Sequence, residues 1–270
     1  MRIVLNMLKG LIIGASMSVP GVSGGTMAIL LGCYDDMIRA ISSFMKNVRK
    51  NAFFLLQICA GSVLGIVLIS RVITAGLEND FAREPLLCLF IGVVLGGVPV
   101  MYRKTRSSVS RGWDYLYCLA GLVLVVLIGL IPENVLDLAS GSGPRTVVFL
   151  LIAGFVVAVA LVLPGISAML MLAALGLYET AAKAIADVNL PFLIPLVLGV
   201  LFGVFSTTRL LENLMNRYPR KTYLAIIGFV LGSVHQVLPD RFPAGWAIPL
   251  CVLALPAGFF AITFIAKKQA

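Results

Sequence analysis

The sequence has few charged residues and few side chains suited to catalysis or metal binding. Asp, Glu, Lys and Arg make up only 12% of its 270 residues, whereas 60% are hydrophobic, and the mean hydropathy is +1.04. These values lie far outside the range of soluble domains. The sequence contains one histidine, no Walker loop and no metal-ligand cluster. It therefore excludes a soluble domain and predicts an integral membrane protein without catalytic residues, a cofactor or a metal.

The cysteines are few and isolated from one another. They are Cys33, Cys59, Cys88, Cys118 and Cys251. No pair has metal-ligand spacing, and their number is odd, which argues against a disulfide framework. Because cysteine is commonly buried, we expect these five to be small packing residues.

Positive charge is concentrated in alternate loops. The formal net charge is +9, and the basic residues cluster in four segments, at about 39–50, 103–111, 217–221 and 267–268. The loops at 76–85 and 133–145 are acidic instead. Cytoplasmic loops of membrane proteins carry an excess of Lys and Arg. The pattern therefore places both termini in the cytoplasm and explains the charge without a nucleic-acid partner.

A short element occurs once in each half of the chain, inside apolar sequence. Pro-Gly-Val-Ser at 20–23 is followed by Gly-Cys-Tyr-Asp at 32–35, and Pro-Gly-Ile-Ser at 164–167 is followed by Gly-Leu-Tyr-Glu at 176–179. The start of the chain resembles a secretory signal, but it leads directly into the first copy, so we expect it to belong to the fold. Paired interruptions of apolar segments point to the substrate site of a transporter.

Six segments are long and apolar enough to cross a bilayer core of about 30 Å. They lie at about 53–75, 86–101, 115–132, 190–211, 222–238 and 245–266. If the motif-bearing segments 3–45 and 147–186 also crossed, the alternation of basic loops would fail. We therefore predict that each enters the membrane and returns on the same side. The predicted fold is an all-α integral membrane protein with about six transmembrane helices and two re-entrant helical hairpins.

The two halves, at 1–135 and 146–270, are predicted to form an inverted-topology repeat within a single membrane domain. Three spans per half is an odd number, so the second half enters the membrane from the opposite side. A backbone break at membrane depth must be buried in protein or line a wet cavity. The tips of the two hairpins should therefore face each other near the midplane.

The first motif has the chemistry of an anion site. Gly21, Gly24 and Gly25 allow close approach, and the backbone N–H groups after the break begin a helix at the positive end of its dipole. Ser23 and Thr26 add hydroxyl donors. These groups suit phosphate or carboxylate, although a helix N-cap inside a hairpin turn explains them equally well.

The second motif is poorer in polar groups. It keeps Gly165 and Ser167 but continues with Ala168 and Met169 instead of a glycine pair. We therefore expect the first hairpin to make more of the contacts with a ligand.

Five further residues are candidates for binding or coupling. Arg71 and Arg209 occupy matching places in the two halves, where they could clamp phosphate or extend to the interface. His235, Asp35 and Glu179 could couple transport to protons, or be hydrogen-bonded and solvated only.

With its Pro-Gly-Val-Ser-Gly-Gly-Thr core, the segment 14–34 resembles the bacterial polyprenyl-phosphate transporter family, formerly a domain of unknown function. The second Pro-Gly-Ile-Ser, followed by Gly-x-Tyr, is also similar, and the resemblance covers essentially the whole chain. The chain departs from the family at 16–18, where Ser-Met-Ser replaces Ala-Asn before the first proline, and at 168–169, where Ala-Met replaces Gly-Ser.

The resemblance implies translocation of undecaprenyl phosphate from the outer to the inner leaflet of the bacterial cytoplasmic membrane, for reuse in peptidoglycan and other cell-envelope synthesis. The head group would sit between the hairpin tips and the prenyl tail would remain among the bilayer lipids. A membrane polyprenyl-diphosphate phosphatase and a small organic-anion transporter are the alternatives. Homo-oligomerisation and coupling to a proton or sodium gradient stay open.

Overall fold

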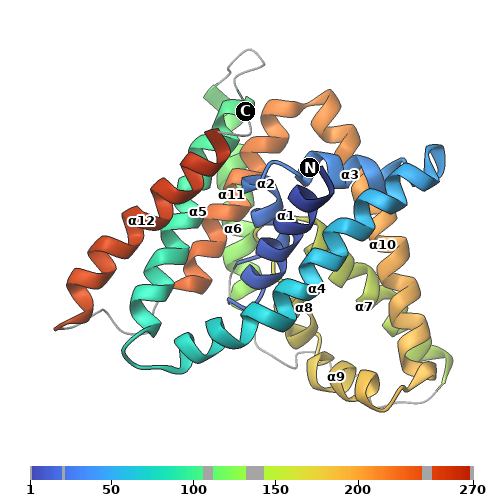
Figure 1. The fold of residues 1–270 in the computed structure, drawn as a ribbon. Coiled ribbons are helices and arrows are strands. Elements are labelled where there is room, and N and C mark those ends of the chain that lie inside the picture. Colours follow the sequence, from blue (N-terminus) through green and yellow to red (C-terminus); the bar gives the residue numbers. More distant parts are fainter. Residues whose placement is uncertain (1, 20–21, 106–111, 132–142, 239–244, 268–270) are drawn as a thin grey trace.

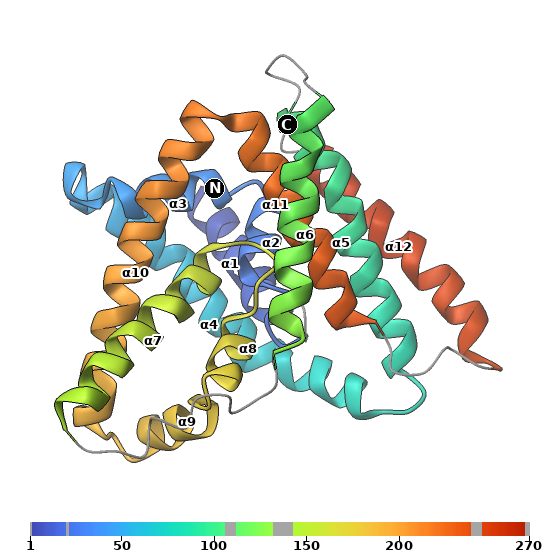
Figure 2. The same ribbon diagram turned by 180° about the vertical axis from the view of Figure 1, so that it is seen from behind.

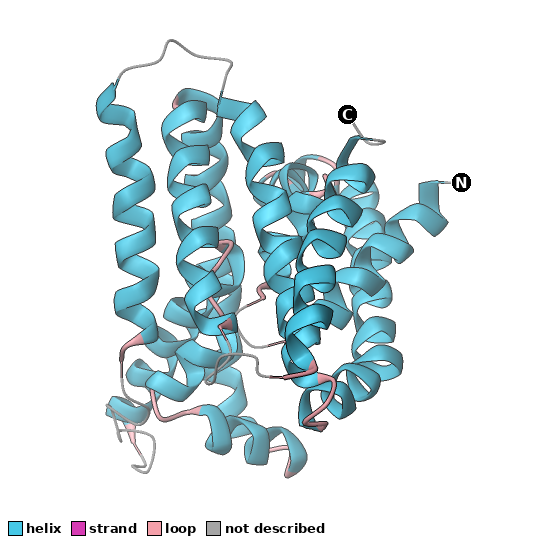
Figure 3. Cartoon of the chain, turned by 90° about the vertical axis from the view of Figure 1, so that its left-hand side faces the viewer, coloured by secondary structure: helices cyan, strands magenta, loops and turns pink. Residues whose placement is uncertain are grey.

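The computed structural model describes residues 2–19, 22–105, 112–131, 143–238 and 245–267. Over these residues the fold is entirely helical, with no β-strand (Figure 3). The helices in chain order are α1 (Arg2–Ser16), α2 (Gly24–Leu30), α3 (Tyr34–Ser42), η1 (Phe44–Lys46), α4 (Val48–Glu78), α5 (Arg83–Thr105), η2 (Gly112–Asp114), α6 (Tyr115–Gly129), α7 (Pro144–Val162), α8 (Ala168–Ala174), α9 (Tyr178–Ala186), α10 (Leu190–Arg217), α11 (Pro219–Val237) and α12 (Ala247–Lys267).

Four pairs of long helices make most of the packing. α1 packs along α4, α7 along α10, α5 along α12 and α6 along α11. α5 and α11 also pack against each other and join two of these pairs in the interior. Many side chains on the outer faces of α4, α6, α10 and α12 are large, apolar and exposed, as expected for surfaces covered by lipid.

Within the described residues, six helical segments are long and apolar enough to cross a membrane, so the chain is a multi-pass membrane protein. They are α4, α5, η2 with α6, α7, α10 and α12. Five coincide with predicted spans, but the predicted span at 222–238 forms α11, which is less apolar because it carries Arg220, Lys221 and His235. α11 lies in the interior, where many of its residues are buried against protein. α7, which we assigned to a hairpin, has the length and composition of a span instead.

The two broken helices run inward from opposite ends of the bundle (Figures 1 and 2). α1 begins at the end where α5 and α12 finish and where α10 turns into α11; α3 also lies there. This end, which carries Arg103, Lys104, Arg217, Arg220 and Lys221, is called the basic end below. α7 begins at the opposite end, near α9. Both α1 and α7 stop near the middle of the bundle.

A glycine turn follows each short helix after the break. Gly32 and Gly176 have φ values of 62° and 68°, which glycine adopts without steric cost. The amide of Cys33 donates to the carbonyl of Ala28 at 2.9 Å, and that of Leu177 to the carbonyl of Leu172 at 2.8 Å. These are the hydrogen bonds of a Schellman C-cap. The chain therefore turns after α2 and after α8, and α8 and α9 are bent by 106° relative to each other, like a re-entrant pair.

Candidate functional site

The serine of each motif caps the short helix that follows the break. Ser23 has an extended backbone (φ −88°, ψ 147°), and its hydroxyl oxygen accepts a hydrogen bond from the amide of Thr26 at 3.1 Å. Ser167 does the same for α8, where the amide of Leu170 donates at 3.4 Å. Serine is a preferred N-cap because its side chain satisfies one of the free amides of the first turn. Ser23 and Ser167 are therefore both helix N-caps, a role that the sequence suggested for the first motif.

The two motifs also touch each other. The amide of Gly165 donates a hydrogen bond of 2.9 Å to the hydroxyl oxygen of Ser23. A Cβ atom on Gly25 would lie 3.3 Å from the Cα of Pro164, and one on Gly165 would lie 2.4 Å from the carbonyl oxygen of Phe229. Glycine at both positions lets the backbones approach this closely. Of the predicted site residues, Gly21 lies outside the described part of the chain.

A cavity of about 370 Å³ opens beside the contact between the motifs. Its lining includes Ser23, Gly24 and Gly25 from the first motif and Ser167 from the second, with Thr208 of α10. Among the described residues that line it, none is charged. Thr26 lies just behind, fully buried, with its hydroxyl 3.0 Å from that of Ser23. The structure thus gathers Ser23, Gly24 and Gly25 of the first motif and Ser167 of the second around one mostly apolar space.

Tyr34 links the first hairpin to the end of α7. Its hydroxyl donates a 2.7 Å hydrogen bond to the carbonyl of Val162, which belongs to the last turn of α7. Burial raises the pKa of the Tyr34 phenol well above its usual value, so the group stays protonated and remains a donor. Sequence reasoning missed this role, although the repeated Gly-x-Tyr after each motif was a signal for it. Tyr178, the matching tyrosine, is 42% exposed.

Asp35 takes part in a polar cluster that fastens α3 to the interior. Its Oδ2 lies 2.5 Å from the ammonium nitrogen of Lys104 in α5 and accepts a 2.9 Å hydrogen bond from the hydroxyl of Tyr223 in α11. The two charged side chains are about one third exposed. Sequence reasoning proposed Asp35 for coupling but identified neither partner, since no local pattern connects residues so far apart in the chain.

The remaining predicted residues lie away from the cavity. Arg71 and Arg209 are exposed on α4 and α10, and the guanidinium of Arg209 lies 4.6 Å from the ring centre of Phe205. His235 and Glu179 are exposed on α11 and α9. None of these four side chains lines the cavity.

A buried ion pair stabilises the basic end. Arg220 Nε lies 3.0 Å from Asp114 Oδ2, and the same guanidinium donates to the carbonyl of Thr105 at 3.2 Å. The side chains of Arg220 and Asp114 are only 7% and 8% exposed. The pair therefore ties the end of α5 and the start of α6 to the start of α11. The sequence identified Arg220 only as one of several loop cations.

Comparison with known proteins identifies the family of the chain. Residues 13–247 match the undecaprenyl phosphate translocase-like family. A polyprenyl-phosphate transporter of Vibrio cholerae is 27% identical over 256 residues, which cover 89% of this chain and 79% of the relative. A polyprenyl-phosphate transporter of Staphylococcus aureus is 32% identical over 247 residues, covering 87% and 86%. No solved structure matches the chain. The match over most of its length and the two relatives show that this chain belongs to the undecaprenyl phosphate translocase-like family.

Proposed function

We propose that this protein carries undecaprenyl phosphate, a polyprenyl-phosphate lipid, from the outer to the inner leaflet of the bacterial cytoplasmic membrane, for reuse in cell-envelope synthesis. The observation that carries the proposal is the cavity at the contact between two broken helices. Both relatives are named transporters of this lipid class. A hydrolase would need an acid and a base facing the cavity, and no described lining residue supplies a carboxylate or an imidazole.

In this proposal the phosphate is held by neutral donors. Ser23, Thr26 and Ser167 supply hydroxyl groups, and the glycines of the first motif let the phosphate approach the backbone amides. Neutral donors bind a phosphate less tightly than buried cations, which suits a site that must release its ligand. The apolar walls leave the prenyl chain in lipid. Arg71 and Arg209 would contact head groups only at the membrane faces.

We also propose that the two halves form an inverted repeat that works by alternating access. The packing of α1 on α4 corresponds to that of α7 on α10, and α5 on α12 corresponds to α11 on α6. The correspondence is broken at the hairpins, because α3 packs on α10 whereas α9 does not pack comparably on α4 among the described residues. Such an asymmetry is expected of a transporter held in one of its two states.

The basic end would face the cytoplasm, with both termini on that side. Coupling to an ion gradient would act through Asp35, because its cluster joins the first hairpin to α5 and α11.

The test is leaflet transfer by the purified protein in liposomes that hold undecaprenyl phosphate in both leaflets. An added phosphatase that cannot cross the membrane hydrolyses only outer-leaflet lipid unless the protein exchanges the two pools. Wild type should make the whole pool accessible, and Ser23→Ala should not. Ser70→Ala is the matched control, because the hydroxyl of Ser70 bonds within its own helix, to Ile66. Wild-type protein that leaves the inner pool protected would overturn the proposal.

A further inference from the structure

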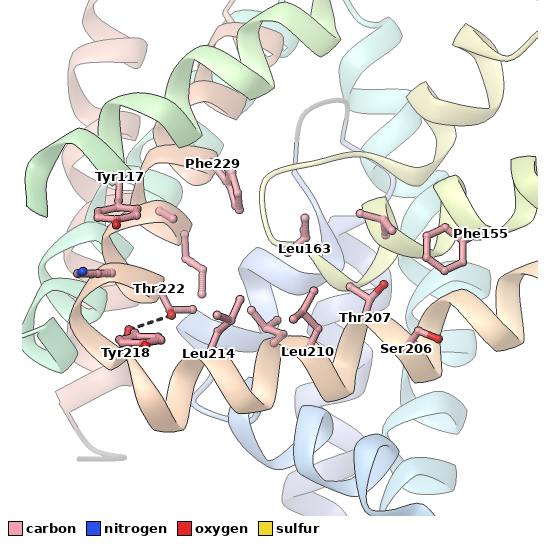
Figure 4. A pocket seen from close by; sticks show the side chains of 15 residues that line it. Tyr117, Phe155, Leu163, Ser206, Thr207, Leu210, Leu214, Tyr218, Thr222 and Phe229 are labelled. Carbon is pink, nitrogen blue, oxygen red and sulfur yellow. Dashed lines mark hydrogen bonds between the residues drawn. The ribbon is translucent and has the colours of Figure 1, made fainter.

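A second and larger cavity lies beside the second broken helix. It has a volume of about 780 Å³ and is enclosed by α6, α7, α10 and α11 (Figure 4). Tyr117 and Phe229 lie on one side, and Leu210 and Leu214 of α10 lie on the other. We call this space the lateral groove. Along α10 its lining extends from Ser206 to Leu214, a distance of about 12 Å in an α-helix.

One cation stands at one end of the lateral groove. Lys221 is the single charged side chain among the described lining residues. Its ammonium nitrogen lies 5.3 Å from the ring centre of Tyr117 and 5.6 Å from that of Tyr218, so the two rings flank it. The nearby Asp114 is bound to Arg220, and the described part of the chain gives Lys221 no ion pair of its own. The ammonium is therefore free to bind an anion.

The other part of the groove reaches the second motif. Leu163, the residue before Pro164, points into it, and Phe229 lies beside it, with its carbonyl packed against Gly165 (Figure 4). Neighbouring residues face different cavities: Val162 lines the cavity between the motifs and Leu163 lines the groove. The groove and the motif cavity are thus separated by little more than the end of α7 and one face of α10.

We propose that the lateral groove is a docking site for the transported polyprenyl phosphate at the basic end, with the phosphate on Lys221 and the chain along Leu214, Leu210 and Leu163. This inference rests on the proposed function and adds a second lipid-binding site to it. A positive charge at one end of the long, apolar lateral groove is complementary to a lipid with one anionic head and one apolar chain. From Lys221 the head group would move along the groove, over about 12 Å of α10, to reach the motifs.

Binding of radiolabelled undecaprenyl phosphate to the whole protein in detergent tests both parts of the groove. Lys221→Gln should weaken binding about tenfold, the effect of losing one charge-assisted contact, and Lys221→Arg should retain it. Leu210→Trp should also weaken binding, because the larger side chain fills the groove. The controls are Lys267→Gln, an exposed lysine at the basic end, and Leu253→Trp, a leucine that is 68% exposed.

The uncharged polyprenol separates the head-group contact from the chain contact. Lys221→Gln should leave its binding unchanged, whereas Leu210→Trp should reduce it. If each test variant and its control changed lipid binding equally, the proposal that the groove binds the lipid would be overturned. Competition by phosphatidylglycerol as effective as that by undecaprenyl phosphate would overturn it too, because the groove would then be a general lipid site.

Leaflet transfer distinguishes failure of this inference from failure of the proposed function. If transfer is lost in Ser23→Ala but normal in Lys221→Gln and Leu210→Trp, the groove is not a docking site for the transported lipid, and the proposed transport function still stands. No transfer by wild type would remove the proposed function itself. Monodisperse elution and a cooperative thermal unfolding transition show that each variant is folded.

Discussion

The amide of Gly165 donates a hydrogen bond to the hydroxyl of Ser23, and thereby joins two broken helices that enter the bundle from opposite ends. The same oxygen accepts the amide of Thr26 and so caps α2. One hydroxyl therefore holds both the local turn and the contact between the hairpins. Because both amides donate to this oxygen, its own hydroxyl proton remains for an acceptor such as a phosphate oxygen or the Thr26 hydroxyl, which lies 3.0 Å away.

Ser23→Ala is expected to lower stability as well as transport. It removes an N-cap and a buried hydrogen bond between the motifs, which together are worth about 1–2 kcal/mol. The unfolding temperature in detergent should fall, whereas that of Ser70→Ala should not. An unchanged unfolding temperature in Ser23→Ala would show that the contact with Gly165 contributes nothing.

Gly165→Ala is expected to destabilise the contact between the motifs more directly. Gly165 has a φ of 82°, which costs other residues about 1–2 kcal/mol, and a Cβ atom would lie 2.4 Å from the carbonyl oxygen of Phe229. Thermal unfolding should show a clear loss. Gly112→Ala is the control, because a Cβ there meets nothing within 4 Å. Equal unfolding temperatures for the two variants would contradict the prediction.

Tyr34→Phe is expected to destabilise the protein by about 1–3 kcal/mol. The change leaves the carbonyl of Val162 buried without the hydroxyl that binds it. Tyr178→Phe, at the matching place after the second motif, should have little effect because that side chain is 42% exposed. Thermal unfolding of the two variants side by side measures the difference, and a larger effect at Tyr178 would refute it.

Asp114→Asn is expected to cost about 3–5 kcal/mol of stability, because it removes the carboxylate that pairs with the buried guanidinium of Arg220. Asp36→Asn breaks the pair with Arg39, whose side chains are more than 60% exposed, and should change stability by less than about 1 kcal/mol. Denaturant unfolding of both variants gives the comparison. Similar small losses would mean that the Asp114 pair is solvated.

Several features of the fold and the site follow from local chemistry and were predicted on that basis. Composition alone identifies a membrane protein, because long apolar helices satisfy their own backbone groups and can therefore lie in lipid. The breaks before Ser23 and Ser167 follow from proline, glycine and an N-cap hydroxyl, which act within a few residues of one another. Family membership follows from the same two motifs.

The contacts between residues that lie far apart in the sequence were decided by the tertiary structure alone. Ser23 meets Gly165, Tyr34 meets Val162 and Asp35 meets Lys104 through the way that helices pack, and no periodic pattern encodes such distant pairings. For the same reason Arg71 and Arg209, matched in sequence, lie away from the cavity. The sequence by itself determined the membrane class and the broken helices, because these depend on composition and local backbone chemistry. It also determined the family, through the two motifs. Only the packing of the helices decided which residues share the cavity and where the lateral groove runs.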